Sequence, residues 1–487
     1  MADSTSRRPQ YQLPEEYGPA LPPRRAPAAG EPPVRTLPRD HPADAGLVVA
    51  DAPAPPPSRR ERRQEAHSAK KARKARTARA RWVRRGIVVA LVVVLVPIAW
   101  SYVHALQRPG TDSLGIRTVE WIRDHGGNGI VNTVERWWYT NNPPAVGGRP
   151  DRIEVQGTAA AVPVTTKVPT ATLPPQPEHL PPPMQRVPTP APGVEANEGV
   201  WQPAGRLVGG LPAEYITFVR PDAIHTSYYV ALMWLDTKLL KAVYVPGLQE
   251  PGGGENPWGA EVPDAARSTL IAAFNSGFKM DSANGGVYFG GQEVRPLVPN
   301  AASLVIRSDG SATVGVWGRD VSMAPDVVAV RQNLALLIDD GQLDPALDEN
   351  DTSKWGATLG NKALVWRSGV GVDRNGALIY AGGNSLSVLS LARTLQAAGA
   401  VRAMELDINT DWVSAYTYVN DPPNDPNAPV IGIKLGGDMS RGGDRYLQPG
   451  ERDFFAFFAN PSFPKPPAPV TTTTTPGGTT TTTTTPR

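Results

Sequence analysis

The chain contains no cysteine among its 487 residues, so disulfide bonds, thiol catalysis and thiolate metal sites are excluded. Histidine is nearly as scarce, because residues 201–460 hold only His225, and a lone histidine is more often structural than catalytic. The sequence also lacks a Gly-x-Ser-x-Gly nucleophile elbow, a phosphate-binding P-loop and a dinucleotide-binding fingerprint. Acid–base chemistry in this protein must therefore come from carboxylates.

Long apolar runs are equally rare, and the one present, IVVALVVVLVPIAWSYVHAL, follows directly on a basic run. About 20 helical residues cross a bilayer core of about 30 Å, so residues 86–106 are predicted to form a single transmembrane helix. The basic residues between Arg59 and Arg85 place the N-terminus in the cytoplasm and the rest of the chain outside. A basic run can also bind nucleic acid, but beside a span it is better explained by topology and anionic lipid, and no nucleic-acid partner is expected. A cleaved signal peptide is the alternative to a retained anchor.

Composition changes along the chain and divides it into six segments. The predicted order is a disordered basic cytoplasmic tail (1–85), a transmembrane helix (86–106), juxtamembrane amphipathic helices (107–140), a Pro-rich linker (141–200), a folded domain (201–460) and a Thr/Pro-rich low-complexity tail (461–487). The linker suits polyproline II, which gains about 3.1 Å per residue. The tail is typical of an O-glycosylated stalk or of plain disorder.

The juxtamembrane segment is predicted to form two short helices that are separated at Gly126-Gly127. It is rich in aromatic residues, which suit a membrane interface or a docking face. These residues are Trp121, Trp137, Trp138 and Tyr139. A small helical cap on the folded domain is the alternative interpretation.

The folded domain carries strand signals, two hairpins and one clear helix. YITFVR, KAVYV and TLIAAF are rich in β-branched and aromatic residues. Turns at Asp309-Gly310 and Asn375-Gly376 predict two hairpins. Residues 386–398 have an apolar stripe and precede Gly399, which predicts a helix that stops there. Because this helix leads directly into a strand, we expect an α+β fold, a mixed β-sheet domain with hairpins and a few helices.

The run AMELDINTDW places four oxygen-bearing side chains at every second position, namely Glu405, Asp407, Asn409 and Asp411. On an extended strand, alternate side chains point to the same face. Burying several carboxylates on one face is costly, so such a face predicts a site for a cation, a sugar or another substrate. A solvated strand edge is the alternative.

A calcium site is one version of this prediction. Asp407-x-Asn409-x-Asp411 shares the first three ligand positions of a calcium-binding loop. Trp412 stands where that loop needs glycine, and the distal glutamate is missing, so the pattern argues against an EF-hand. No cofactor is certain, and calcium at another kind of site stays open.

Four segments in order resemble the phosphodiester glycosidase family over about residues 231–458. They are AAFNSGFKM with GGVYFGG, then ALLIDDGQL, then WRSGVGVDRNGALIY, and finally SLSVLSLARTLQAAGAVRAMELD. The resemblance implies that Asn275 and Phe278 bind substrate and that Arg367 is the family's arginine, with a guanidinium suited to phosphate. It also implies that Asp407 is a nucleophile or base. The chain departs from the family at Asp-Ile-Asn-Thr-Asp, where a glycine-rich turn is usual.

Other residues complete the predicted site. Glu405, expected on the same face as Asp407, should have a raised pKa if water is excluded, and Lys279 would add a second positive charge. Asn409 and Asp411 are expected to contact substrate, and the carboxylate spacing leaves retention or inversion open.

Together these features predict a glycosidase in the cell membrane, single-pass, with an extracytoplasmic domain that cleaves sugar-1-phosphodiester linkages in a cell-wall or capsular glycan. The alternative is a non-catalytic glycan-binding or calcium-binding module on the same scaffold.

Overall fold

The computed structural model describes residues 58–108, 112–150, 178–252, 258–348, 350, 354–356, 363–423, 425, 427–461, 471–474 and 480–483. The chain divides into two units, Met1–Ile87 and Val88–Arg487. Most of the predicted N-terminal tail, residues 1–57, and the middle of the predicted linker, residues 151–177, lie outside the described residues.

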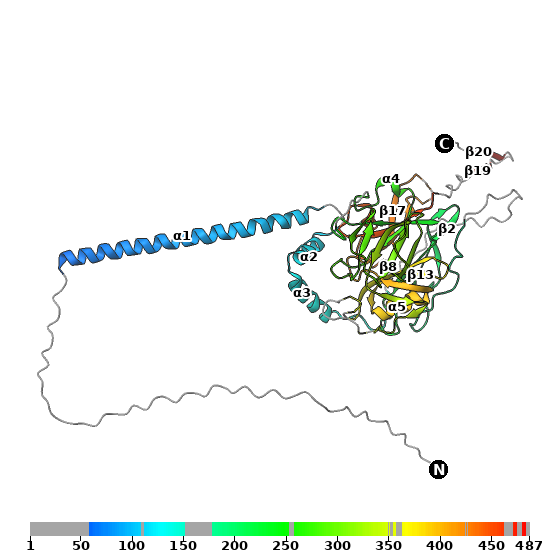
Figure 1. Ribbon diagram of the computed structural model, residues 1–487, viewed down its shortest axis with the longest axis horizontal. Coiled ribbons are helices and arrows are strands. Elements are labelled where there is room, and N and C mark those ends of the chain that lie inside the picture. The colour runs from blue at the N-terminus through cyan, green and yellow to red at the C-terminus, as the bar shows by residue number, and fades with distance from the viewer. Residues whose placement is uncertain are drawn as a thin grey trace, which may run out of the picture. The chain divides into compact units, whose positions relative to one another are not determined.

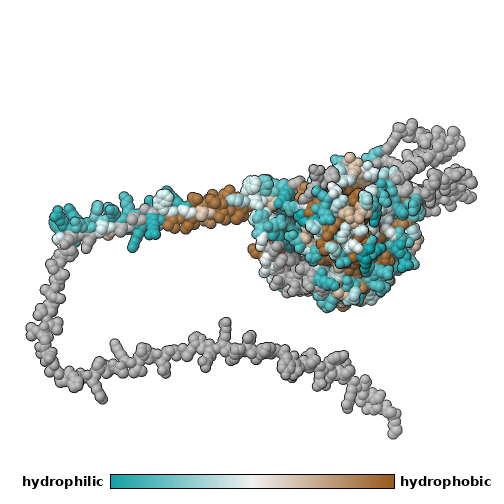
Figure 2. Space-filling view, in the orientation of Figure 1, coloured by the Kyte–Doolittle hydropathy of each residue, from teal (hydrophilic) through white to brown (hydrophobic). Residues whose placement is uncertain are grey.

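The first helix, α1, spans Arg59–Leu106. Within it, Arg81–Leu106 is long and apolar enough to cross a membrane. Figure 2 shows the change from a hydrophilic to a hydrophobic surface along this helix. The basic stretch from Arg59 to Arg85 was predicted to be disordered but is helical. Its arginine, lysine, alanine and glutamate residues are strong helix formers, which favours a helix despite the high charge.

Two short helices follow, α2 (Leu114–Asp124) and α3 (Asn128–Asn141). They are separated at Gly126-Gly127, where Gly126 has a φ of +81° that favours glycine. The Ser113 side chain accepts a hydrogen bond from the backbone of Ile116 and so caps α2. Of the aromatic residues predicted to face a membrane or a partner, Trp137 is exposed, while Trp121 is half-buried.

Three sheets make up most of the folded domain (Figure 1). The eight-stranded sheet has the order β1-β2-β3-β14-β13-β15-β11-β12. Its strands are β1 (Gln202–Val208), β2 (Leu211–Val219), β3 (Val230–Leu235), β11 (Leu336–Asp339), β12 (Gln342–Leu343), β13 (Val365–Asp373), β14 (Leu378–Leu386) and β15 (Ala400–Glu405).

Two five-stranded sheets accompany it, with the orders β17-β16-β5-β18-β4 and β7-β6-β10-β8-β9. The strands of the first are β4 (Leu240–Val245), β5 (Leu270–Asn275), β16 (Ala415–Asn420), β17 (Val430–Lys434) and β18 (Phe454–Ala459). Those of the second are β6 (Val287–Phe289), β7 (Gln292–Arg295), β8 (Ala302–Arg307), β9 (Ala312–Val316) and β10 (Val327–Gln332). A short helix α4 (Asp264–Arg267) and a 3-10 turn η2 (Arg445–Leu447) lie in connections.

The eight-stranded sheet is covered on both faces, as β3 illustrates. All six residues of VALMWL are buried. Met233 and its alternate neighbours pack in a core shared with the five-stranded sheets, whereas Trp234 and its alternate neighbours pack in a second core with α5. A continuous apolar strand of this kind is expected when neither face meets water. Each fully buried large apolar side chain stabilises the fold by about 1.5–3 kcal/mol.

Helix α5 (Val388–Ala397) packs on β13, β14 and β15. Its apolar stripe, including Leu391 and Leu395, is buried in the second core. Ser387 caps its N-terminus, and Gly399 with a φ of +103° ends it. The predicted helix and its direct lead into an internal strand, β15, are therefore confirmed. Both predicted hairpins are also confirmed, as β8–β9 and β13–β14.

Three expectations need correction. The sheets were predicted to be mixed, but every pairing between named strands is antiparallel. The predicted linker of 141–200 packs on the domain in its last part, because Leu180 and Val187 are buried in the second core. In the predicted low-complexity tail, β19 (Thr471–Thr474) and β20 (Thr480–Thr483) pair with each other.

Candidate functional site

The ends of two strands bring the candidate site together. Strand β5 ends at Asn275 and β15 ends at Glu405. Beyond those ends, the Asp407 amide donates to the Ser276 carbonyl at 3.2 Å, and the Asp407 carbonyl accepts from the Ser368 amide at 3.0 Å. The backbone of Asp407 is thus held between two sheets.

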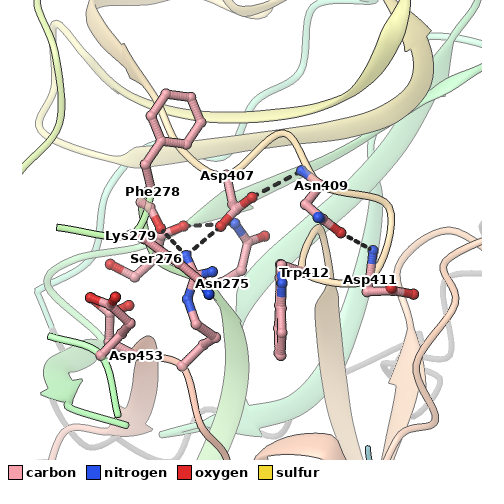
Figure 3. A network of polar contacts seen from close by, with 12 residues as sticks. Asn275, Ser276, Phe278, Lys279, Asp407, Asn409, Asp411, Trp412 and Asp453 are labelled. Carbon is pink, nitrogen blue, oxygen red and sulfur yellow. Dashed lines mark hydrogen bonds and ion pairs between the residues drawn. The ribbon is translucent and has the colours of Figure 1, made fainter. Parts of the chain in front are cut away.

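The acidic run does not continue as a strand, which corrects the prediction of four side chains on one face. The Asp407 carboxylate accepts from the Asn409 amide at 2.9 Å, and the Asn409 side chain accepts from the Asp411 amide at 2.8 Å. Figure 3 shows these three residues connected in series. Asp and Asn side chains that bond the backbone two residues further on form turns, which compete with sheet pairing. The pattern of alternate oxygens therefore produces a loop.

Glu405 and Arg367 form a fully buried ion pair with each other. The Arg367 Nη1 atom lies 2.6 Å from Glu405 Oε1, and both side chains are 0% exposed. The Arg367 guanidinium also donates to the backbone carbonyls of Leu386 and Trp355. Neither residue lines a described cavity. The prediction that Arg367 faces a phosphate is therefore wrong in placement, and Glu405 is paired with Arg367 instead of lining the cavity with Asp407.

Asn275 is also fully engaged inside the protein. Its side-chain oxygen accepts from the Tyr380 hydroxyl and the Ser414 amide, and its nitrogen donates to Ser276 and Ser368. The residue is 2% exposed. Asn275 therefore connects β5 with β13, β14 and the residue just before β16, and its amide has no capacity left for the predicted contact with substrate.

A cavity of about 470 Å³ opens beside Asp407. Five of the predicted site residues line it, namely Phe278, Lys279, Asp407, Asn409 and Asp411. Trp412 and Arg452 line it too, and α2 contributes a wall that includes Ile116 and Glu120. The structure thus brings together the part of the predicted site that follows β5 and β15, together with a helix from the juxtamembrane segment.

Asp407 is the buried carboxylate of this cavity, with only 4% of the residue exposed. Arg452 Nη2 lies 2.6 Å from Asp407 Oδ2 and also donates to the Gly277 carbonyl. Burial raises the pKa of the Asp407 carboxyl, while the Arg452 guanidinium acts in the opposite direction. A carboxylate with a raised pKa next to a fixed cation is suited to act as a nucleophile or a base.

Lys279 is the most accessible cation of the cavity, with 30% of its side chain exposed. It forms ion pairs with Glu120 and Asp124, both on α2. Lys279 and Asp407 thus line the same cavity, with the lysine charge held by two carboxylates of α2.

The arginines around Trp412 were missed by sequence reasoning. The guanidinium carbons of Arg441, Arg445 and Arg452 lie 5.0, 4.9 and 5.2 Å from the centroid of the Trp412 ring. The available signal was three arginines within the glycine-rich run GGDMSRGGDRYLQPGERD, where charge in a loop is often functional. Two other aromatic residues near the site in sequence, Trp366 and Tyr416, are buried in the cores.

Across the part of the chain that the structure describes, no group of three histidine or acidic side chains is arranged to hold a metal ion. Within the acidic run, Asp407 and Asn409 bind backbone amides of their own loop.

A scan against protein-family models finds no match, and a search of curated proteins finds none either. Among solved structures, the fold has a distant likeness to the catalytic domain of zebrafish N-acetylglucosamine-1-phosphodiester alpha-N-acetylglucosaminidase, auto-inhibited by its pro-peptide. The identity is 14% and the TM-score 0.32, over 50% of this chain and 82% of that one. A hypothetical protein from Synechocystis is similar at 13% identity and a TM-score of 0.26, over 48% of this chain and 59% of the other. Scores this low indicate a distant structural relationship and do not bear on the activity of this chain.

Proposed function

We propose that this protein is a membrane-anchored hydrolase whose extracytoplasmic domain cleaves sugar-1-phosphodiester linkages in a cell-wall or capsular glycan. The observation that carries the proposal is the position of Asp407. It is a buried carboxylate at the wall of a cavity of about 470 Å³, with Arg452 as its ion-pair partner and Lys279 nearby. This combination meets the needs of a reaction in which a sugar cation forms as a phosphate departs.

This reaction needs one carboxylate at the anomeric carbon, and it does not need an acid to protonate the leaving group. When the bond between the anomeric carbon and the phosphate oxygen breaks, the electron pair leaves with the phosphodiester oxygen, which is stable without protonation. Asp407 either bonds to the anomeric carbon and is later released by water, or takes a proton from the attacking water. Lys279 and Arg452 would stabilise the departing negative charge.

The position of Glu405, which does not line the cavity, agrees with this scheme. Ordinary glycosides need a second carboxylic acid to protonate the leaving group. Glu405 is committed to Arg367 and is 0% exposed, so it is unsuited to that role. A phosphodiester leaving group makes that second acid unnecessary.

One observation favours a different function. Both oxygens of Asp407 already have partners, since Oδ1 accepts from the Asn409 amide and Oδ2 from Arg452. A carboxylate held in this way also suits a non-catalytic module that binds glycan, or calcium, at the same cavity.

The test is hydrolysis by the full-length chain in detergent, using a panel of chromogenic sugar-1-phosphodiesters, with calcium and with a chelator. Wild type should release sugar from at least one member, and Asp407→Asn should lose on the order of 10²-fold or more in rate. Asp326→Asn, in an exposed ion pair with Arg307, is the matched control and should keep wild-type rates. If wild type cleaves no member but binds wall glycan, and Asp407→Asn loses that binding, the binding module replaces the hydrolase.

A further inference from the structure

Three arginine side chains gather around Trp412 at the edge of the candidate site. Arg441, Arg445 and Arg452 are 4%, 7% and 7% exposed, and all three guanidinium groups lie over the same indole. A cation over an aromatic ring is stabilised only modestly. That gain is small beside the cost of removing three like charges from water, so the cluster needs negative charge.

Among the described residues, only two of the three arginines have a carboxylate partner. Arg452 pairs with Asp407 and Arg441 with Asp112, each at 2.6 Å. No carboxylate among the described residues lies within ion-pair distance of Arg445. Asp411 supplies its backbone carbonyl to Arg441 and Arg445.

Each of the three guanidinium groups also retains a buried N–H group that has no hydrogen-bond partner among the described residues. The atoms are Nη2 of Arg441, Nε of Arg445 and Nε of Arg452. Buried polar groups without a partner are rare and costly, particularly on a charged side chain. An anion bound at the cluster would supply acceptors for such groups.

The place of that ligand is marked by Asp112, whose side chain is 8% exposed and bonds Arg441 from the segment just before α2. Arg441 also lines a second cavity, of about 520 Å³, together with Ser440 and Asp411. This cavity shares Ile116, Val119 and Asp411 with the cavity beside Asp407. An anion bound to Arg441 would therefore lie next to the candidate site.

We propose that Arg441, Arg445 and Arg452 form a phosphate-binding subsite, and that the Asp112 carboxylate occupies part of it in this structure. A phosphate group has enough acceptor oxygens for several arginine N–H groups and matches their planar geometry. The subsite adds a substrate preference to the proposed hydrolase, and the biological role of the subsite rests on that proposed function. Together with the cavity beside Asp407, the subsite favours binding of a polymer that carries repeated phosphate groups and disfavours a neutral glycan.

The test measures binding of inorganic phosphate to the full-length chain in detergent by isothermal titration calorimetry at constant ionic strength. Asp112→Asn should bind phosphate several-fold more tightly than wild type, because a competing carboxylate is removed. Arg441→Gln should bind about tenfold more weakly or worse, since a hydrogen bond to a charged group contributes about 1.5–3 kcal/mol and about 1.4 kcal/mol is a factor of ten. Arg307→Gln, which alters an exposed ion pair elsewhere, is the control and should bind as wild type does.

The two variants predict changes of opposite sign, which general damage to the fold cannot produce. If Arg441→Gln does not fold, tighter binding by Asp112→Asn still supports the subsite, and unchanged binding by Asp112→Asn overturns it. Absence of phosphate binding by both wild type and Asp112→Asn also overturns it and leaves the arginines with a structural role. Inorganic phosphate is not hydrolysed, so these outcomes are independent of whether the chain cleaves any phosphodiester.

Discussion

Glu214 gives this protein a stability that should depend on pH, and the size of the effect follows from its surroundings. The residue lies in β2, is 0% exposed, and accepts a hydrogen bond from the Thr417 hydroxyl. No described cation forms an ion pair with it. Burial raises the pKa of its carboxyl from 4.5 to about 8, and the hydrogen bond from Thr417 opposes this only in part. Glu214 is therefore protonated in the folded protein at neutral pH.

The direction in which stability changes with pH follows from the linkage between protonation and folding. A carboxyl whose pKa is higher in the folded state stabilises the fold. This stabilisation is fully present below pH 4.5 and is lost as the pH rises to about 8. At about 1.4 kcal/mol for each tenfold change in proton affinity, the total is up to about 5 kcal/mol. Roughly 3 kcal/mol of it is lost by pH 7.

The measurement is the free energy of unfolding from urea titrations at intervals between pH 5 and pH 8, for wild type and Glu214→Gln. Glutamine keeps the shape and cannot ionise, so the difference between the two chains should move in favour of the variant by several kcal/mol across this range. Any constant cost of the new amide cancels in that comparison. Parallel pH profiles for the two chains would show that Glu214 is already ionised when folded and would refute the reasoning.

Three further predictions follow from other parts of the structure. Glu405→Gln should lower the free energy of unfolding by about 3–5 kcal/mol, because it leaves the buried Arg367 charge without its partner; a loss below 1 kcal/mol in urea titration would contradict this. Gly205→Ala should destabilise by about 1–3 kcal/mol, since Gly205 has a φ of +67° and a new Cβ would lie 2.8 Å from Glu214 Oε2; an unchanged urea midpoint would count against it. Protease added to intact cells should digest the folded domain and spare the basic N-terminal segment, and protection of the domain would reverse the orientation.

Local patterns in the sequence predicted the secondary structure of the domain well. Asp309-Gly310 and Asn375-Gly376 determine tight turns through backbone conformation alone, and both hairpins are present. The helix α5 was predicted because its apolar spacing and the glycine after it are local features. These signals act within a few residues and need no knowledge of the rest of the fold.

The partners of the charged residues could not be predicted in the same way. Arg452 reaches Asp407 across 45 residues and Arg331 reaches Asp453 across 122. Such pairs depend on how sheets pack, which the spacing of residues does not encode. Residues 178–200 were likewise taken for linker because proline is frequent there, although Leu180 and Val187 supply buried apolar side chains.

Glu405 and Asp407 occupy different positions because the strand ends between them, and only Asp407 lines the candidate site. Both are buried carboxylates with an arginine at 2.6 Å, and they are two residues apart. Glu405 is the last residue of β15, paired in register with Gly369 of β13, and its side chain is fully buried against Arg367. After it, the strand ends, the Asp407 backbone bonds both Ser368 of β13 and Ser276, and the Asp407 side chain forms a turn with Asn409 at the cavity. Had the strand continued, the period of two would have placed both carboxylates on one face. The residues that end the strand are therefore as necessary to the candidate site as the carboxylate that lies in it.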